Sequence, residues 1–128
     1  MKHWIPSIVF ALLIFFLSSE SHIPGANMAP DYVEHFLVYG VFSLTIVWGL
    51  TGGLRRKLAP GLAAAAFFIA TLYGATDEFH QFFVPGRDSS LSDLAADAVG
   101  AACFTLLGFL AIRLWSRRAT AAVPPESA

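Results

Sequence analysis

The chain has 128 residues, of which 56% are hydrophobic, and its mean hydropathy is +0.64. A soluble domain of this length is far less apolar, so water is not the main solvent of this protein. Charged residues make up 13% of the chain and lie in short stretches between long uncharged runs, which is the pattern of membrane spans and loops. The net charge of -1 conceals an asymmetry along the chain, so the overall charge gives no information about partners. We expect membrane lipids as partners and no nucleic acid.

The first two apolar runs cover about residues 4–19 and 31–51. The first run follows Lys2 and is either a short membrane helix or the apolar part of a signal peptide. Residues 19–21 are a poor match to a cleavage site, so we expect the helix to be retained. Turn-forming residues at 18–30 separate the two runs, and Gly52 and Gly53 end the second.

The third and fourth runs cover about residues 58–83 and 92–115. Ser90 and Asp93 have the spacing of a capping box, which predicts the start of the fourth helix. The sequence therefore predicts an all-α, four-helix transmembrane bundle in a domain of residues 1–118. Residues 119–128 lack periodicity and apolar surface, and we expect them to form a disordered cytoplasmic tail.

Basic residues predict the orientation, because positive charge beside a span resists translocation. Seven of the eight Lys and Arg residues fall into three segments that alternate with the other loops, and Arg87 is the exception. This pattern predicts a multi-pass protein of a bacterial inner membrane with both termini in the cytoplasm. The seven residues are Lys2, Arg55, Arg56, Lys57, Arg113, Arg117 and Arg118.

Polar residues at helical spacing collect at the predicted outer ends of three spans. An ionisable group within a span costs about 2.5 to 3.5 kcal/mol, so these groups are expected to face protein, water or a partner. Gly100 allows a neighbouring helix to approach closely. Arg87 is expected to pair with Glu78 or Asp93, with a lipid phosphate as the alternative. The polar residues are Asp31, Glu34, His35 and Tyr39, then Asp77, Glu78, His80 and Gln81, then Asp93 and Asp97.

Three interpretations of this polar cluster remain open. It can serve only to hydrogen-bond the helices together, or it can bind a ligand with the help of two helix N-termini that point toward it. It can also perform acid–base chemistry, for which Glu78, His35 and His80 are the candidates. No metal-binding signature, nucleophile elbow or phosphate-binding glycine loop is present, and we expect no metal and no cofactor.

A set of short motifs is spread over the last three predicted helices and their connections. The motifs are Asp31, His35-Phe36, Tyr39, Tyr73-Gly74, Asp77-Glu78-Phe79-His80-Gln81, Phe83-Val84-Pro85-Gly86-Arg87, Asp93, Asp97 and Gly100. Through these motifs the chain resembles the VanZ-like family of membrane proteins over roughly residues 4–115. The chain departs from the family pattern at Tyr32, where a lysine commonly follows the aspartate, and at Asp97, where asparagine is frequent. The resemblance implies a multi-span bacterial membrane protein in a family whose namesake is associated with low-level resistance to the glycopeptide teicoplanin.

We therefore expect the outer cluster to engage an envelope component, such as a lipid headgroup or a lipid-linked cell-wall precursor. One alternative is an enzyme that acts on a lipid-linked substrate with a Glu/His acid–base pair. Another is a transporter of a small solute or proton that works as an oligomer, with Asp97 as the carrier. The expected binding residues are Asp31, His35, Tyr39, Asp77, Glu78, Gln81, Arg87, Asp93 and Asp97.

Overall fold

The computed structural model describes residues 1–21 and 30–121, and every regular element in these ranges is a helix. A short 3₁₀ turn, η1, leads into the first α-helix. The elements are η1 (Lys2–Trp4), α1 (Ile5–Ser18), α2 (Asp31–Leu50), α3 (Pro60–Gln81) and α4 (Leu91–Ala121). The all-α prediction is confirmed for the described residues.

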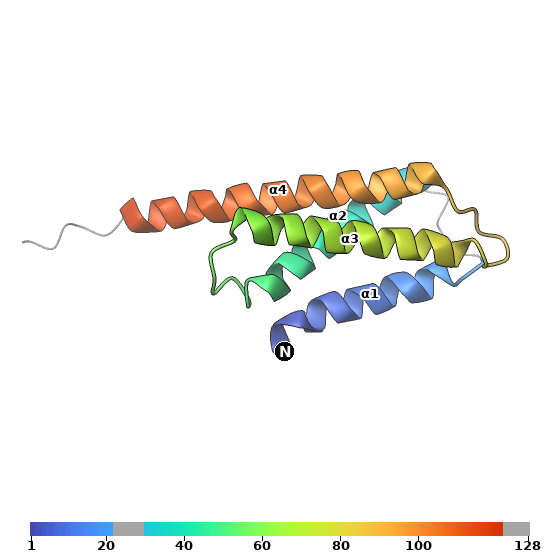
Figure 1. Cartoon of the computed structure of the whole chain (residues 1–128), viewed down its shortest axis with the longest axis horizontal. Coiled ribbons are helices and arrows are strands. Elements are labelled where there is room, and N and C mark those ends of the chain that lie inside the picture. Colours follow the sequence, from blue (N-terminus) through green and yellow to red (C-terminus); the bar gives the residue numbers. More distant parts are fainter. Residues whose placement is uncertain (22–29, 122–128) are drawn as a thin grey trace, which may run out of the picture.

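The four helices alternate in direction along the bundle (Figure 1). Helices α2 and α4 form the most extensive pair, and α3 packs against both. Helix α1 packs on α2 and α3, on the side of the bundle away from α4 (Figure 1). One end of the bundle therefore gathers the ends of α1 and α3 and the starts of α2 and α4.

Local sequence explains where α2 ends and α3 begins. Gly52, Gly53 and Leu54 all have positive φ angles, of 63°, 75° and 64°. Glycine adopts this left-handed conformation without strain, so two glycines in succession stop α2 and turn the chain. Pro60 then occupies the first turn of α3, where its missing N–H leaves no hydrogen bond unmade.

A glycine brings α2 and α4 close together. A Cβ atom on Gly100 would clash with the backbone carbonyl oxygen of Phe36 on α2. The close approach expected at Gly100 from the sequence is therefore present. Large side chains cannot occupy this contact, which fixes the two helices at a short separation.

Polar groups form much of the interior, and apolar groups form much of the surface. Among the described residues, buried polar or charged side chains include Ser43, Thr51, Asp77, Glu78 and Asp97. Large apolar side chains are exposed on every α-helix, including Phe16 on α1, Leu37 on α2, Phe68, Leu72 and Phe79 on α3, and Leu107 and Leu114 on α4. This distribution is unusual for a protein surrounded by water.

Two described helices are long and apolar enough to cross a membrane, namely α2 and the Leu91–Ser116 part of α4. A shorter apolar helix covers Lys2–Ser18. Helix α3 has 22 residues, but alanines form much of its apolar stretch and its last turns carry Asp77, Glu78, His80 and Gln81. Its length therefore suits a span better than its composition does.

Helix α4 corrects the predicted tail. It continues to Ala121, so residues 119–121 are helical rather than disordered. Alanine and arginine are strong helix formers, and they extend the helix beyond the point where its apolar character ends. Residues 122–128 of the predicted tail lie outside the described residues.

Candidate functional site

Helix ends bring the candidate residues together at the end of the bundle that carries the loop between α3 and α4 (Figure 1). His35 lies on the second turn of α2, Asp77 and Glu78 on the last turns of α3, and Asp97 on the second turn of α4. The basic connection between α2 and α3 lies at the opposite end. The sequence predicted this collection of polar groups, and the structure determines which of them meet.

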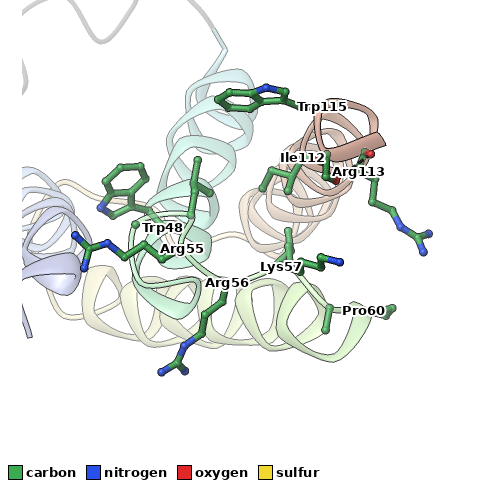
Figure 2. A pocket seen from close by; sticks show the side chains of 13 residues that line it. Trp48, Arg55, Arg56, Lys57, Pro60, Ile112, Arg113 and Trp115 are labelled. Carbon is green, nitrogen blue, oxygen red and sulfur yellow. Dashed lines mark hydrogen bonds between the residues drawn. The ribbon is translucent and has the colours of Figure 1, made fainter. Parts of the chain in front are cut away.

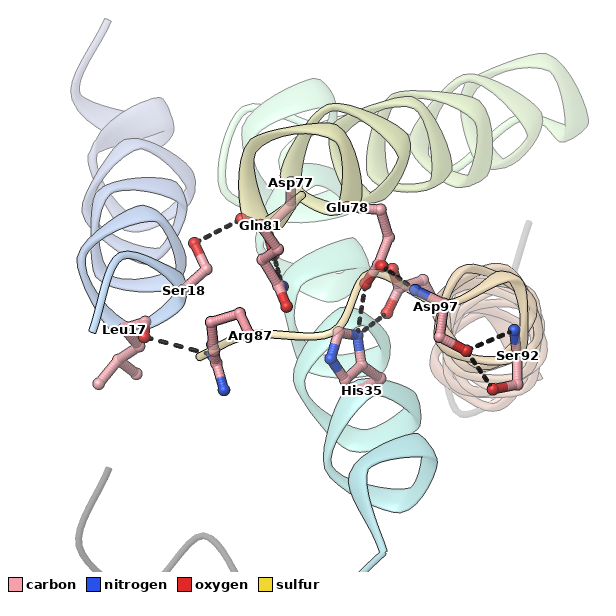
Figure 3. A network of polar contacts seen from close by, with 10 residues as sticks. Leu17, Ser18, His35, Asp77, Glu78, Gln81, Arg87, Ser92 and Asp97 are labelled. Carbon is pink, nitrogen blue, oxygen red and sulfur yellow. Dashed lines mark hydrogen bonds and ion pairs between the residues drawn. The ribbon is translucent and has the colours of Figure 1, made fainter. Parts of the chain in front are cut away.

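His35, Glu78 and Asp97 form one cluster, called here the carboxylate–histidine cluster (Figure 3). The Nδ1 atom of His35 lies 2.9 Å from Oδ1 of Asp97 and 3.7 Å from Oε1 of Glu78. An ionised carboxylate only accepts hydrogen bonds, so Nδ1–H is the donor to an ionised Asp97. One imidazole therefore links α2, α3 and α4.

Asp97 is the most deeply placed member of the cluster, with 0% of its side chain exposed. Gly74 on α3 makes room for it, since a Cβ atom at that position would lie 2.6 Å from Oδ2 of Asp97. The Oδ2 atom is buried and has no hydrogen-bond partner among the described residues, and Oε1 of Glu78 is in the same situation. Two carboxylate oxygens therefore retain acceptor capacity beside the imidazole.

Glu78 also joins α3 to the start of α4. The backbone N–H of Ser90 donates to Oε2 of Glu78 over 2.8 Å, and the Ser90 hydroxyl accepts from the N–H of Ser92 over 3.1 Å. Ser90 is thus the expected N-cap of α4. The reciprocal bond of the expected capping box comes from Glu78, however, and not from Asp93.

A second group of contacts attaches α3 to α1 (Figure 3). The Ser18 hydroxyl donates to Oδ1 of Asp77 over 2.6 Å, and the Gln81 amide donates to Oδ2 over 3.1 Å. All three side chains are buried. Asp77 and Gln81 therefore belong to the α1 interface rather than to the carboxylate–histidine cluster.

His80 and Arg87 also turn toward α1. Nε2 of His80 lies 2.9 Å from the Ser19 hydroxyl, and its ring lies 4.8 Å from that of Phe15, measured between centroids. Nη2 of Arg87 donates to the carbonyl oxygen of Leu17 over 3.3 Å, at the negative end of the α1 dipole. The expected pairing of Arg87 with Glu78 or Asp93 is therefore wrong within the described part of the chain.

The remaining predicted residues differ in their surroundings. The Tyr39 ring is buried and stacks on His35, with centroids 6.2 Å apart and planes 10° apart. Asp93 is 8% exposed and makes no hydrogen bond or ion pair with a described residue. Asp31 and Tyr32 are exposed at the start of α2, so neither belongs to the buried cluster.

The contacts that α1 makes with the polar residues could not be predicted from the sequence. Ser18 ends an apolar run and has no motif around it, yet its hydroxyl binds a buried carboxylate. The hydrogen bonds made by the backbone groups of Leu17 and Ser90 could not be predicted either, because a sequence motif describes side chains only. The parallel packing of α1 on α3 reveals Ser18 and Leu17, and the packing of α3 beside the start of α4 reveals Ser90.

The carboxylate–histidine cluster has two chemical capacities. A carboxylate that holds one imidazole nitrogen fixes the tautomer and leaves the other nitrogen to accept or donate a proton. His35 is 17% exposed, and its Nε2 atom has no hydrogen bond to a described residue. In addition, the three side chains each offer one ligand atom, all within 4.8 Å of one another, which is a spacing that a divalent cation can use.

Two apolar helices in an all-helical bundle with a polar interior are typical of a membrane protein. A family model described as VanZ/LLP1 matches residues 3–116. The match covers most of the chain, so the protein belongs to the VanZ/LLP1 family. No curated protein and no solved structure matches the chain.

Proposed function

We propose that this VanZ-family protein crosses a bacterial inner membrane four times and binds the polar headgroup of an envelope component at its outer face. The ligand is a lipid or a lipid-linked cell-wall precursor, and the carboxylate–histidine cluster is the binding site. The observation that carries the proposal is the buried Asp97 carboxylate bound to a partly exposed His35 imidazole. The hydrogen bond to Asp97 fixes the orientation of the His35 imidazole, so the exposed part of the ring can bind a polar ligand in a defined position.

The surface supports placement of all four helices in the bilayer. In hydrocarbon, backbone groups must be satisfied within the protein, and helices meet this requirement. Phe68, Leu72 and Phe79 of α3 are 66%, 68% and 68% exposed, as expected for side chains in contact with lipid. Helix α3 rises about 33 Å over its 22 residues, which is sufficient for a span.

Charge supports the orientation. Lys2, Arg55, Arg56, Lys57 and Arg113 lie at the end of the bundle that holds the N-terminus and the α2–α3 connection. The carboxylate–histidine cluster lies at the other end. Under the positive-inside rule, the cluster faces the periplasmic side and both termini face the cytoplasm.

The experiment compares envelope lipids and cell-wall precursors in a deletion strain complemented with variant genes. Glu78→Gln and Asp97→Asn preserve side-chain shape and remove charge, and we expect both to reproduce the profile of the deletion. Glu34→Gln is the matched control, because Glu34 lies one residue from His35 and makes no hydrogen bond or ion pair with the described residues of the cluster. Wild-type profiles for both cluster variants, at equal membrane levels, contradict the proposal.

Teicoplanin susceptibility in the same strains tests the link to glycopeptide resistance. If the headgroup ligand is a cell-wall precursor, loss of the cluster changes teicoplanin susceptibility together with the precursor profile. A change in lipids alone, with unchanged susceptibility, assigns the ligand to the lipid class and removes the resistance link.

A second candidate function, acid–base catalysis on a lipid-linked substrate, is favoured by the contact between Asp97 and Nδ1 of His35. This arrangement orients Nε2 as a base, and Glu78 supplies a second titratable group 3.7 Å from the ring. The test is a lipid-turnover assay with reconstituted protein. If Glu78→Gln and His35→Ala proteins turn over substrate at the wild-type rate, the catalytic hypothesis is excluded.

A further inference from the structure

A large groove lies at the end of the bundle opposite the carboxylate–histidine cluster (Figure 2). It has a volume of about 940 Å³ and lies between the α2–α3 connection and residues 112–116 of α4. The volume is at the upper end of the range for small-molecule sites. We call it the basic groove, because its lining includes Arg55, Arg56, Lys57 and Arg113.

The charge of the groove has a single sign. Its lining holds four cationic side chains and no Asp or Glu. Figure 2 shows Lys57 pointing between Pro60 at the start of α3 and Arg113 on α4. Arg55 and Arg56 point away from α4. The Arg113 guanidinium carbon lies 5.0 Å from the centre of the Phe109 ring, a cation–π contact that restrains it on α4.

The walls of the groove are apolar and aromatic. Trp48 of α2 and Trp115 of α4 line it and are 41% and 70% exposed, and Leu58 of the α2–α3 connection and Ile112 of α4 also line it. Tryptophan prefers the boundary between hydrocarbon and water, where its ring is apolar and its N–H remains hydrated. The groove therefore combines a cationic rim with a surface that suits an acyl chain.

We propose that the basic groove binds an anionic phospholipid of the cytoplasmic leaflet, with its phosphate at the cationic rim and its acyl chain along the apolar wall. A soluble anion would use only the rim and would leave the exposed aromatic wall in water. Charge complementarity excludes a zwitterionic lipid as the preferred occupant, since the lining has no acid to meet its cation. The inference requires the proposed orientation but not the outer binding site.

Intrinsic fluorescence of the full chain tests the proposal, because two of its three tryptophans line the groove. A Trp4→Phe background leaves Trp48 and Trp115 as the emitters. The protein is reconstituted in vesicles of phosphatidylcholine that contain increasing amounts of brominated phosphatidylglycerol or brominated phosphatidylcholine. We expect stronger quenching by phosphatidylglycerol, and a preference that declines as salt is added.

Substitutions locate the preference in the groove. Lys57→Gln and Arg113→Gln are each expected to lower the relative association constant for phosphatidylglycerol about five-fold, the effect of about one interfacial cation. Lys2→Gln is the matched control, because it removes a cation at the same end that does not line the groove. It is expected to leave the constant unchanged, and circular dichroism of each variant verifies its helix content.

Three outcomes overturn the proposal. Equal quenching by the two brominated lipids in the wild-type protein denies any anionic preference, and this measurement needs no variant. An equal decrease on Lys2→Gln assigns the preference to general surface charge. Competition by millimolar inorganic phosphate at constant ionic strength assigns the groove to a soluble anion. All three outcomes leave the outer site untested and are independent of it.

Discussion

His35 is the residue on which the outer site depends, because its Nδ1 atom contacts Asp97 and Glu78 from two other helices. Its position and those of both carboxylates could be expected from helical spacing in the sequence. The different partners of Asp77 and Glu78 could not be expected from the sequence. These residues are adjacent in the chain, and yet Asp77 contacts α1 and Glu78 contacts the start of α4. A rotation of about 100° per residue separates them, and packing alone decides which helix each one meets.

The first prediction concerns Asp97. Asp97→Asn retains an acceptor oxygen for His35, so the free energy of unfolding should change by less than about 1 kcal/mol. Asp97→Ala removes the acceptor beside the partly buried Nδ1 donor of His35 and should destabilise the protein by about 1 to 3 kcal/mol. Denaturant titration of the purified protein in mild detergent, followed by far-ultraviolet circular dichroism, measures both. Equal stability of the two variants contradicts the assigned hydrogen bond.

The second prediction concerns Ser18, whose hydroxyl contributes to the attachment of α1. Ser18→Ala leaves Oδ1 of Asp77 without this buried donor, and should lower the free energy of unfolding by about 1 to 3 kcal/mol. Ser89→Ala is the control, because Ser89 is exposed and makes no contact with Asp77. The same denaturant titration applies, and matching midpoints for the two variants refute the role of Ser18.

At the scale of elements, hydropathy predicted the helices well and their ends less well. The expected spans 31–51 and 58–83 match α2 (Asp31–Leu50) and α3 (Pro60–Gln81) to within two residues at each end. Helix α4 is longer than its apolar run, because helix formation depends on backbone propensity and not on hydrophobicity. The cap that Glu78 provides for α4 was beyond prediction, since it joins two helices across a loop.

The third prediction compares two glycines on α4 that face α2. Gly100→Ala should separate α2 from α4, because the added methyl group meets the rigid backbone at Phe36. Gly108→Ala meets only the tip of the Leu44 side chain, at 3.0 Å, which can rotate away. We expect a loss of about 1 to 3 kcal/mol for Gly100→Ala and less than about 1 kcal/mol for Gly108→Ala.

Thermal unfolding of both glycine variants beside the wild-type protein provides the measurement. The difference between the variants is the informative quantity, because both carry the same added methyl group on one helix. A Gly108→Ala protein that is less stable than Gly100→Ala would show that α2 and α4 do not meet at Phe36.

At the scale of the whole molecule, the two ends of the bundle differ in chemistry. One end holds buried carboxylates with an imidazole, and the other holds a cationic groove with exposed tryptophans. The alternation of helices required this separation, so it could be predicted from the order of charges along the sequence. The groove itself could not be predicted from the sequence, because its lining residues Ile112 and Leu58 are distant in the chain and only folding brings them together.

The fourth prediction tests the orientation with single cysteines in a Cys103→Ala background. Ser89→Cys, between α3 and α4, should react with a membrane-impermeant thiol reagent in intact spheroplasts. Ala59→Cys, before α3, should react only after the membrane is permeabilised, because it lies at the basic end. Both native residues are exposed, so access to the reagent depends on the side of the membrane. The opposite labelling pattern would invert the proposed topology.

Helix α1 has 14 residues and rises about 21 Å, or about 27 Å together with η1, which is shorter than a hydrocarbon core of roughly 30 Å. A short span creates hydrophobic mismatch, and the bilayer adapts by thinning around it. Ser18, at the end of this helix, binds Asp77 beside the outer site. With the proposed placement, α1 therefore draws the lipid surface inward at this position, so that a headgroup descends a shorter distance to reach the carboxylates.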